Sequence, residues 1–294
     1  MYRTTFKEEN FFTFQKTQFL TYFQNLSNKS PYNPNSFPEM SPEVITGIQT
    51  IFTNLNLNLE LIKTEKIINH KNWFCKLTAV NQDDINFYLP LISLELSLYP
   101  KNFIKKINLK KIILCNEIII NNNFGEEYRS GIPDNDYEIQ AMIYSTKERN
   151  LKYIRNVIHH ELFHYYYFAD KGCFENSDYY WEMFNPKNFF YNNKETWNNN
   201  DLINNDFSSL NSFVSDFSKK SLEEDKAEIF SYMITSGIST NELGKKEGIL
   251  GKCLIIKKML EDFDREDFLI GQNDFWNRAI LFKKEICDFY YPIL

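Results

Sequence analysis

Five residues near the middle of the chain constrain this sequence most, and they read His160-Glu161-Leu162-Phe163-His164. Residues four apart on a helix project from one face, so the imidazoles of His160 and His164 can bind one tetrahedral metal ion. Glu161 follows the first histidine and would lie beside such a metal, where it can exchange protons with a bound water. The spacing therefore predicts a helix over about residues 149–170 that holds a zinc site.

A third ligand is expected elsewhere in the chain. Catalytic zinc sites use three protein ligands and keep one position for water, whereas structural sites use four protein ligands. Glu224 and Glu228 lie one helical turn apart, so one can bind zinc while the other orients a ligand histidine. Ala227 between them is small enough to let two helices approach closely. An alternative for Glu224 is a capping box with Ser221, because the two have S-x-x-E spacing.

Composition and charge exclude several classes of protein. The net charge of −6 gives no basic footprint for nucleic acid. No apolar window has the length of a membrane span, and Met1 to Asn10 resembles no signal peptide. The five cysteines form no CxxC pair, which favours a reducing compartment. We expect a cytoplasmic protein, or one that a specialised secretion system exports.

Hydrophobic periodicity and turn signals predict an α+β fold, with helices first, then strands, then the motif helix and further helices. Helices are expected at 5–28, 42–55, 85–99, 178–184, 221–236, 248–264 and 273–290, and strands within 57–80, 110–121 and 137–145. We divide the chain into a helical or mixed N-terminal region, 1–84, and a catalytic domain, 85–294.

The motif and the downstream Glu224-Asp225-Lys226-Ala227-Glu228 resemble gluzincin metallopeptidases, in particular bacterial zinc-binding metallopeptidases related to the catalytic domain of anthrax lethal factor. The connecting segments Trp181–Pro186, Phe189–Tyr191 and Ser212–Phe217 add to the likeness, which covers about residues 85–236. It implies a zincin-like fold with a small sheet packed on the active-site helix. It also implies that His160, His164 and Glu224 bind zinc and that Glu228 orients a ligand histidine.

One position departs from the family pattern. The family commonly places a tyrosine seven residues before the ligand glutamate, where the hydroxyl helps to stabilise the oxyanion, but here that position is Phe217. Ser212 also stands where glycine is usual. Another tyrosine from residues 179–191 is expected to supply the hydroxyl. Tyr191 is the first candidate, ahead of Tyr179 and Tyr180.

The sequence thus predicts a zinc metallopeptidase, an endopeptidase in which a zinc-activated water hydrolyses peptide bonds of a protein or peptide. The first alternative is a binding protein that keeps the zinc fold with little or no catalysis, which Phe217 favours. A second alternative is a secreted effector or toxin protease with one specific protein target.

Overall fold

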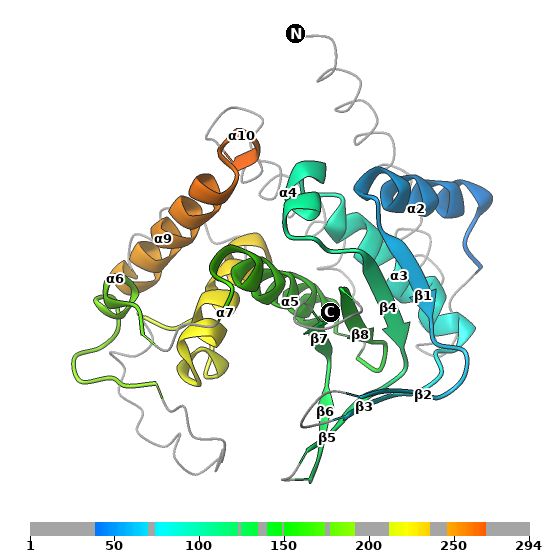
Figure 1. The fold of residues 1–294 in the computed structure, drawn as a ribbon, viewed down its shortest axis with the longest axis horizontal. Coiled ribbons are helices and arrows are strands. Elements are labelled where there is room, and N and C mark those ends of the chain that lie inside the picture. Colours follow the sequence, from blue (N-terminus) through cyan, green and yellow to red (C-terminus); the bar gives the residue numbers. More distant parts are fainter. Residues whose placement is uncertain are drawn as a thin grey trace, which may run out of the picture. The chain divides into compact units, whose positions relative to one another are not determined.

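The structure is a computed structural model of the 294-residue chain (Figure 1). It describes residues 39–69, 74–122, 125–134, 140–148, 150–173, 177–191, 212–235 and 246–268. These residues fall into two compact units, one ending at Leu151 and the other beginning at Lys152.

The first unit contains a mixed four-stranded sheet in the order β1-β4-β8-β7. Its strands are β1 (Asn58–Leu61), β4 (Lys111–Cys115), β8 (Ala141–Ser145) and β7 (Gly131–Asp134). β4 pairs in parallel with both β1 and β8, whereas β7 pairs antiparallel with β8. All five residues of β8 are buried, which is typical of a central strand covered on both faces.

A second, antiparallel sheet has the order β2-β3-β5-β6. Its strands are β2 (Lys66–Asn69), β3 (Phe74–Leu77), β5 (Ile118–Asn122) and β6 (Gly125–Arg129). One cluster of buried side chains draws on both sheets, among them Ile68, Leu77, Ile113, Ile118 and Ile143. The core of this unit therefore joins the two sheets.

Among its described residues, the first unit has three helices: α2 (Pro42–Leu55), α3 (Gln82–Leu96) and α4 (Lys101–Lys106). Ser41 caps α2 by accepting a hydrogen bond from the Val44 amide at 3.4 Å. Asn56 ends α2 in the left-handed region, with φ at 57°, a conformation that asparagine tolerates. The predicted start and end of this helix are confirmed.

The described elements of the second unit are the helices α5 (Leu151–Lys171), α6 (Tyr179–Glu182), α7 (Leu222–Thr235), α9 (Glu247–Phe263) and α10 (Arg265–Phe268), and the 3-10 turn η3 (Phe217–Lys219). α7 packs against both η3 and α9, and α6 packs against α9. α9 also packs against α10, so α7 and α9 together link the described elements of this unit.

The α+β prediction is confirmed, with corrections to individual elements. The single strand expected over 110–121 is two strands, β4 and β5, because the chain turns at Asn116 and passes into the other sheet. The strands β6 and β7 and the short helix α4 were not predicted. The expected helices at 5–28 and 273–290 lie outside the described residues. A domain boundary at residue 84 stays a prediction.

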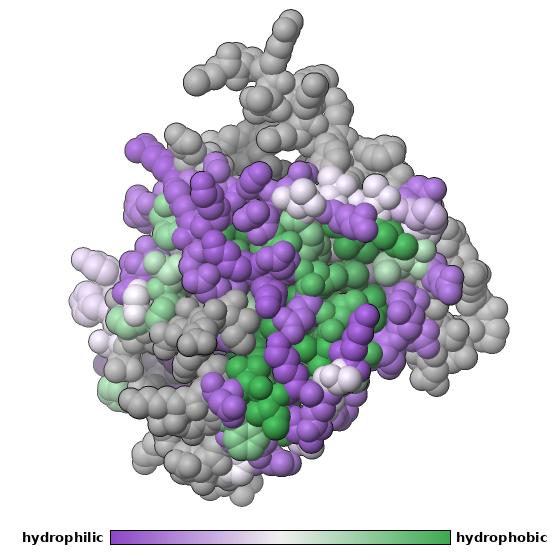
Figure 2. Space-filling view, turned by 45° about the vertical axis from the view of Figure 1, so that its right-hand side comes forward, coloured by the Kyte–Doolittle hydropathy of each residue, from purple (hydrophilic) through white to green (hydrophobic). Residues whose placement is uncertain are grey.

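The described residues include no helix long and apolar enough to cross a membrane. Figure 2 shows one face of these residues, on which hydrophilic side chains lie among hydrophobic ones.

Candidate metal centre

The motif helix α5 brings two histidines to one buried face. His160 and His164 both have side chains that are 9% exposed, and their ring centroids lie 4.7 Å apart. Apolar residues such as Leu162 and Phe163 are fully buried on the remaining faces and fix the helix in the core. Because residues four apart project from one face of a helix, the two imidazoles lie together on this face.

Helix α7 brings a carboxylate to the same spot. Glu224 Oε2 lies 2.9 Å from Nε2 of His160 and 3.2 Å from Nε2 of His164. The two Nε2 atoms are 3.0 Å apart. Ala227, three residues further along α7, is fully buried.

The capping box between Ser221 and Glu224, the alternative role of Glu224, is formed only in part. The Glu224 amide donates to Ser221 Oγ at 3.3 Å, so Ser221 does cap α7. The carboxylate of Glu224 contacts the two imidazoles, which leaves it engaged at the histidine cluster.

The three facing atoms fit a tetrahedral zinc ion. Their separations of 2.9, 3.0 and 3.2 Å describe a nearly equilateral triangle. Bonds of about 2.0–2.1 Å to zinc place tetrahedral ligand atoms about 3.4 Å apart, so an expansion of a few tenths of an ångström admits the ion. Two imidazole nitrogens and one carboxylate oxygen are a donor set that zinc takes when one position stays open. Within the described ranges, this is the one group of three or more such side chains with ligand atoms that close together.

Glu228 lies behind His160, on the side away from the triangle. Its Oε1 accepts from Nδ1 of His160 at 2.9 Å, and its Oε2 accepts from Ser215 Oγ at 2.6 Å. Ser215 Oγ in turn accepts from the Ser218 amide at 3.1 Å. A hydrogen on Nδ1 leaves the lone pair of Nε2 facing the triangle, which is the tautomer a metal ligand needs. Sequence reasoning missed Ser215, whose contact with Glu228 only the tertiary structure reveals.

The electrostatics of the cluster favour a cation. Burial lowers the pKa of His160, but hydrogen bonds with Glu224 and Glu228 outweigh it and raise that pKa to about 10. For Glu224, burial raises the pKa, but the nearby charges of His164 and His160 outweigh burial. The pKa of Glu224 therefore lies well below its ordinary value. The two carboxylates therefore favour a positive charge at the imidazoles, and a divalent metal would also supply such a charge.

Glu161 is half-buried on α5, one position after His160. Its negative charge contributes to the raised pKa of His160, so the carboxylate acts on the cluster electrostatically. Phe217 lies on another side of His160, with ring centroids 5.7 Å apart and an interplanar angle of 65°. The residue that departs from the family pattern is therefore a direct neighbour of the cluster.

The hydroxyl of Tyr191, the first predicted oxyanion donor, belongs to a polar network around Asp225. The Tyr191 hydroxyl donates to Asp225 Oδ2 at 2.6 Å and accepts from Trp181 Nε1 and Asn185 Nδ2, both at 3.1 Å. Its single hydrogen is directed to Asp225. Tyr179 and Tyr180 are 75% and 73% exposed. The donor role of Tyr191 is untested, and the hydrogen bond to Asp225 argues against it.

Asp225 also pairs with a lysine that is completely buried. Lys252 Nζ donates to Asp225 Oδ2 at 2.6 Å and to the Ser212 carbonyl at 2.7 Å, and both charged side chains are 0% exposed. Trp181 Nε1 donates to the same carboxylate oxygen at 2.8 Å. This network joins α6, α7 and α9 directly beside Glu224.

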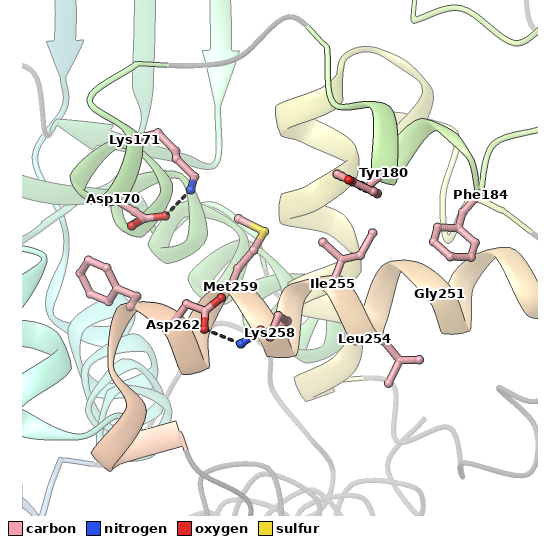
Figure 3. A pocket seen from close by; sticks show the side chains of 11 residues that line it. Asp170, Lys171, Tyr180, Phe184, Gly251, Leu254, Ile255, Lys258, Met259 and Asp262 are labelled. Carbon is pink, nitrogen blue, oxygen red and sulfur yellow. Dashed lines mark hydrogen bonds and ion pairs between the residues drawn. The ribbon is translucent and has the colours of Figure 1, made fainter.

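A separate cavity of about 530 Å³ lies over α9 (Figure 3). Its lining includes Asp170, Tyr180, Phe184, Met259 and Asp262, and none of the histidine cluster. A Cβ on Gly251 would stand 2.1 Å from the Phe184 ring, so glycine is needed for the ring to pack there. The cavity is therefore distinct from the metal centre.

The sequence matches no known family model and no curated protein. One solved structure that it resembles is the 2.10 Å crystal structure of a protein from Bacteroides caccae ATCC 43185, named a "putative zinc-binding metallo-peptidase". The likeness covers 88% of this chain and 98% of that chain, with 13% sequence identity and a TM-score of 0.41. A likeness this distant carries no weight in assigning a function, which has to come from the cluster.

Substitutions at the two glutamates of α7 are expected to differ in their effect on metal binding. Glu224→Gln should weaken zinc binding more than Glu228→Gln, because Glu224 faces both Nε2 atoms whereas Glu228 contacts only Nδ1 of His160. Loss of an orienting carboxylate typically weakens metal affinity by about 10- to 100-fold. Competition with a chromophoric chelator measures both values. A larger loss in Glu228→Gln would contradict the proposed ligand set.

Proposed function

We propose that this protein is a zinc-dependent peptidase that hydrolyses peptide bonds of a protein or peptide substrate. The observation that carries the proposal is the convergence of His160 Nε2, His164 Nε2 and Glu224 Oε2 within 3.2 Å of one another. Glu161 lies on α5, the helix that carries the two histidines. Three ligands leave one coordination position for chemistry, which distinguishes a catalytic site from a structural one. The finer assignment to the gluzincins rests on the sequence resemblance alone.

Zinc held at this cluster would lower the pKa of a bound water to near neutrality and polarise a substrate carbonyl. Glu161 would accept the proton of the attacking water and deliver it to the nitrogen of the leaving amine. Glu228 would keep His160 in the tautomer that presents Nε2, and Ser215 would hold Glu228 in place.

The first experiment is hydrolysis of a defined peptide library by the zinc-loaded protein, followed by mass spectrometry. We expect internal cleavage products that disappear on chelation and return with added zinc. Intact peptides from the zinc-loaded wild type would contradict peptidase activity.

The alternative of a zinc-fold binding protein with little catalysis is favoured by one observation, the position of Phe217. Its ring lies against His160 and has no hydroxyl to offer a substrate. That alternative predicts normal zinc binding without cleavage, so the library experiment separates it from the peptidase. An exported effector with one protein target would share the chemistry of the peptidase and differ by cleaving only a narrow set of sequences.

Tyr191→Phe separates a structural role of this hydroxyl from a catalytic one. The substitution removes the hydrogen bond to the buried Asp225 carboxylate, so we expect a loss of about 1–3 kcal/mol in unfolding free energy. Turnover should stay within a few fold of wild type, because the hydroxyl hydrogen is directed to Asp225. Urea unfolding and kcat measure the two effects. A loss of about 100- to 1000-fold in kcat at normal stability would establish Tyr191 as the oxyanion donor.

A further inference from the structure

The space beside His160 is occupied by an aromatic ring that carries no polar group. The Phe217 ring meets the His160 ring in an edge arrangement at 5.7 Å. Attack on an amide carbonyl builds negative charge on its oxygen, and loss of one aimed donor typically costs about 100- to 1000-fold in turnover. If the cluster hydrolyses peptides, Phe217 is not that donor, and a group near its ring is a candidate to replace it.

A positive charge lies over the same ring. Lys220 Nζ is 3.9 Å from the centroid of the Phe217 ring, within the range of a cation–π contact. The turn η3 brings the two residues close together, since the Lys220 amide donates to the Phe217 carbonyl at 3.1 Å. One aromatic ring thus contacts both a histidine of the cluster and an ammonium group.

From this geometry we propose that Lys220 is a catalytic residue whose ammonium binds the carbonyl oxygen of the scissile peptide bond. The inference rests on the proposed peptidase function and names the electrophilic group of that site. An ammonium group offers three donors and a full charge on a flexible four-carbon chain, so it can leave the ring face and turn toward an oxyanion. Lys220 is half-buried, which strengthens its interaction with a developing charge relative to water.

The preceding lysine is a matched control. Lys219 Nζ pairs with Asp216 Oδ1 at 2.8 Å and contacts no ring of the cluster in the described contacts. It shares with Lys220 the same turn, the same charge and a partly buried side chain. Lys219→Met changes the net charge by the same amount as Lys220→Met, so it tests whether the loss of a nearby positive charge is enough to lower activity.

The kinetic test compares Lys220→Met, Lys220→Arg and Lys219→Met on a peptide that the wild type cleaves. We expect Lys220→Met to lower kcat by about 100- to 1000-fold with little change in KM, since the contact forms mainly in the transition state. Lys220→Arg should retain more activity than Lys220→Met, and Lys219→Met should stay within about twofold of wild type. A Phe217→Tyr/Lys220→Met double variant should recover at least about tenfold, because the new hydroxyl lies beside His160. Wild-type kcat in Lys220→Met would overturn the inference.

A binding measurement gives a readout that does not depend on turnover. Inorganic phosphate mimics a tetrahedral oxyanion, and its affinity for the zinc-loaded protein can be measured by calorimetry. We expect Lys220→Met to weaken phosphate binding by at least about tenfold and Lys219→Met to leave it unchanged. Equal affinity in Lys220→Met, or no phosphate binding to the wild type, would overturn the inference.

The two proposals fail in different ways. If zinc binds and Glu161→Gln stops cleavage while Lys220→Met cleaves like the wild type, the role of Lys220 is wrong and the peptidase proposal stands. If the zinc-loaded wild type cleaves nothing, the peptidase proposal fails and the catalytic role of Lys220 fails with it.

Discussion

Glu161→Gln is expected to lower peptide hydrolysis by about 100- to 10,000-fold while zinc content and fold stay as in the wild type. General acid–base catalysis by one positioned side chain contributes about this much, and an amide cannot accept the proton of the attacking water. The ligand atoms of His160, His164 and Glu224 are unchanged by the substitution, so the metal should remain. Turnover of a cleaved library peptide and metal analysis by mass spectrometry measure the two effects together.

Glu223→Gln is the matched control for Glu161→Gln. Glu223 is also half-buried and sits next to the proposed ligand Glu224, so its loss changes the local charge by the same amount. We expect this variant to keep its turnover within a few fold of wild type. Loss of zinc in Glu161→Gln would show that Glu161 binds the metal, which contradicts its assignment as proton acceptor.

Lys252→Met is expected to lower the unfolding free energy by about 3–5 kcal/mol. The substitution leaves the Asp225 carboxylate buried without its cation, and breaking one side of a fully buried pair costs about this much. Burial raises the pKa of Asp225 and lowers that of Lys252, while their pairing opposes both shifts. Because Asp225 adjoins Glu224 on α7, zinc affinity should also fall. Urea unfolding with and without zinc measures the loss.

An exposed lysine on the same helix provides the comparison. Lys258 pairs with Asp262 on the surface of α9, with side chains 68% and 64% exposed, and such pairs contribute about 0–1 kcal/mol. Lys258→Met should therefore leave stability nearly unchanged. Asp225→Asn in the Lys252→Met background should recover part of the loss, because the carboxylate that lost its cation is then removed as well. Equal, small effects of Lys252→Met and Lys258→Met would show that the buried pair does not stabilise the fold.

The sequence allowed the grouping of His160, His164 and Glu224 to be predicted because its parts are local. His160 and His164 share one helix turn, as do Glu224 and Glu228, so helical periodicity alone puts each pair on one face. Only the meeting of the two helices is long-range, and the paired donor types indicated it. The predicted helices at 42–55 and 248–264 agree closely with α2 and α9 for the same reason, since apolar spacing and, for α2, the Ser41 cap are local signals.

The missed features depend on contacts between distant segments. Asp225 and Lys226 stand in a charged run that is typical of a solvated face, yet both are buried. Their partners, Lys252 and Asp178, lie 27 and 48 residues away, and no spacing rule connects them. No sequence pattern singles out Lys220 either. It becomes a candidate only because its ammonium lies over the Phe217 ring, which contacts His160. The division of residues 110–121 into two strands was missed although Asn116 and Glu117 interrupt the isoleucine-rich run at the turn.

The zinc content of the purified protein tests the central claim most directly. The account predicts about one zinc per chain in the wild type, bound with high affinity, and a loss of that zinc in His160→Ala and His164→Ala. The melting temperature should rise on zinc addition in the wild type alone, because a ligand of the native state adds to its stability. Elemental analysis that finds no zinc in the wild type after reconstitution, or equal zinc in the histidine variants, would contradict the proposed metal centre.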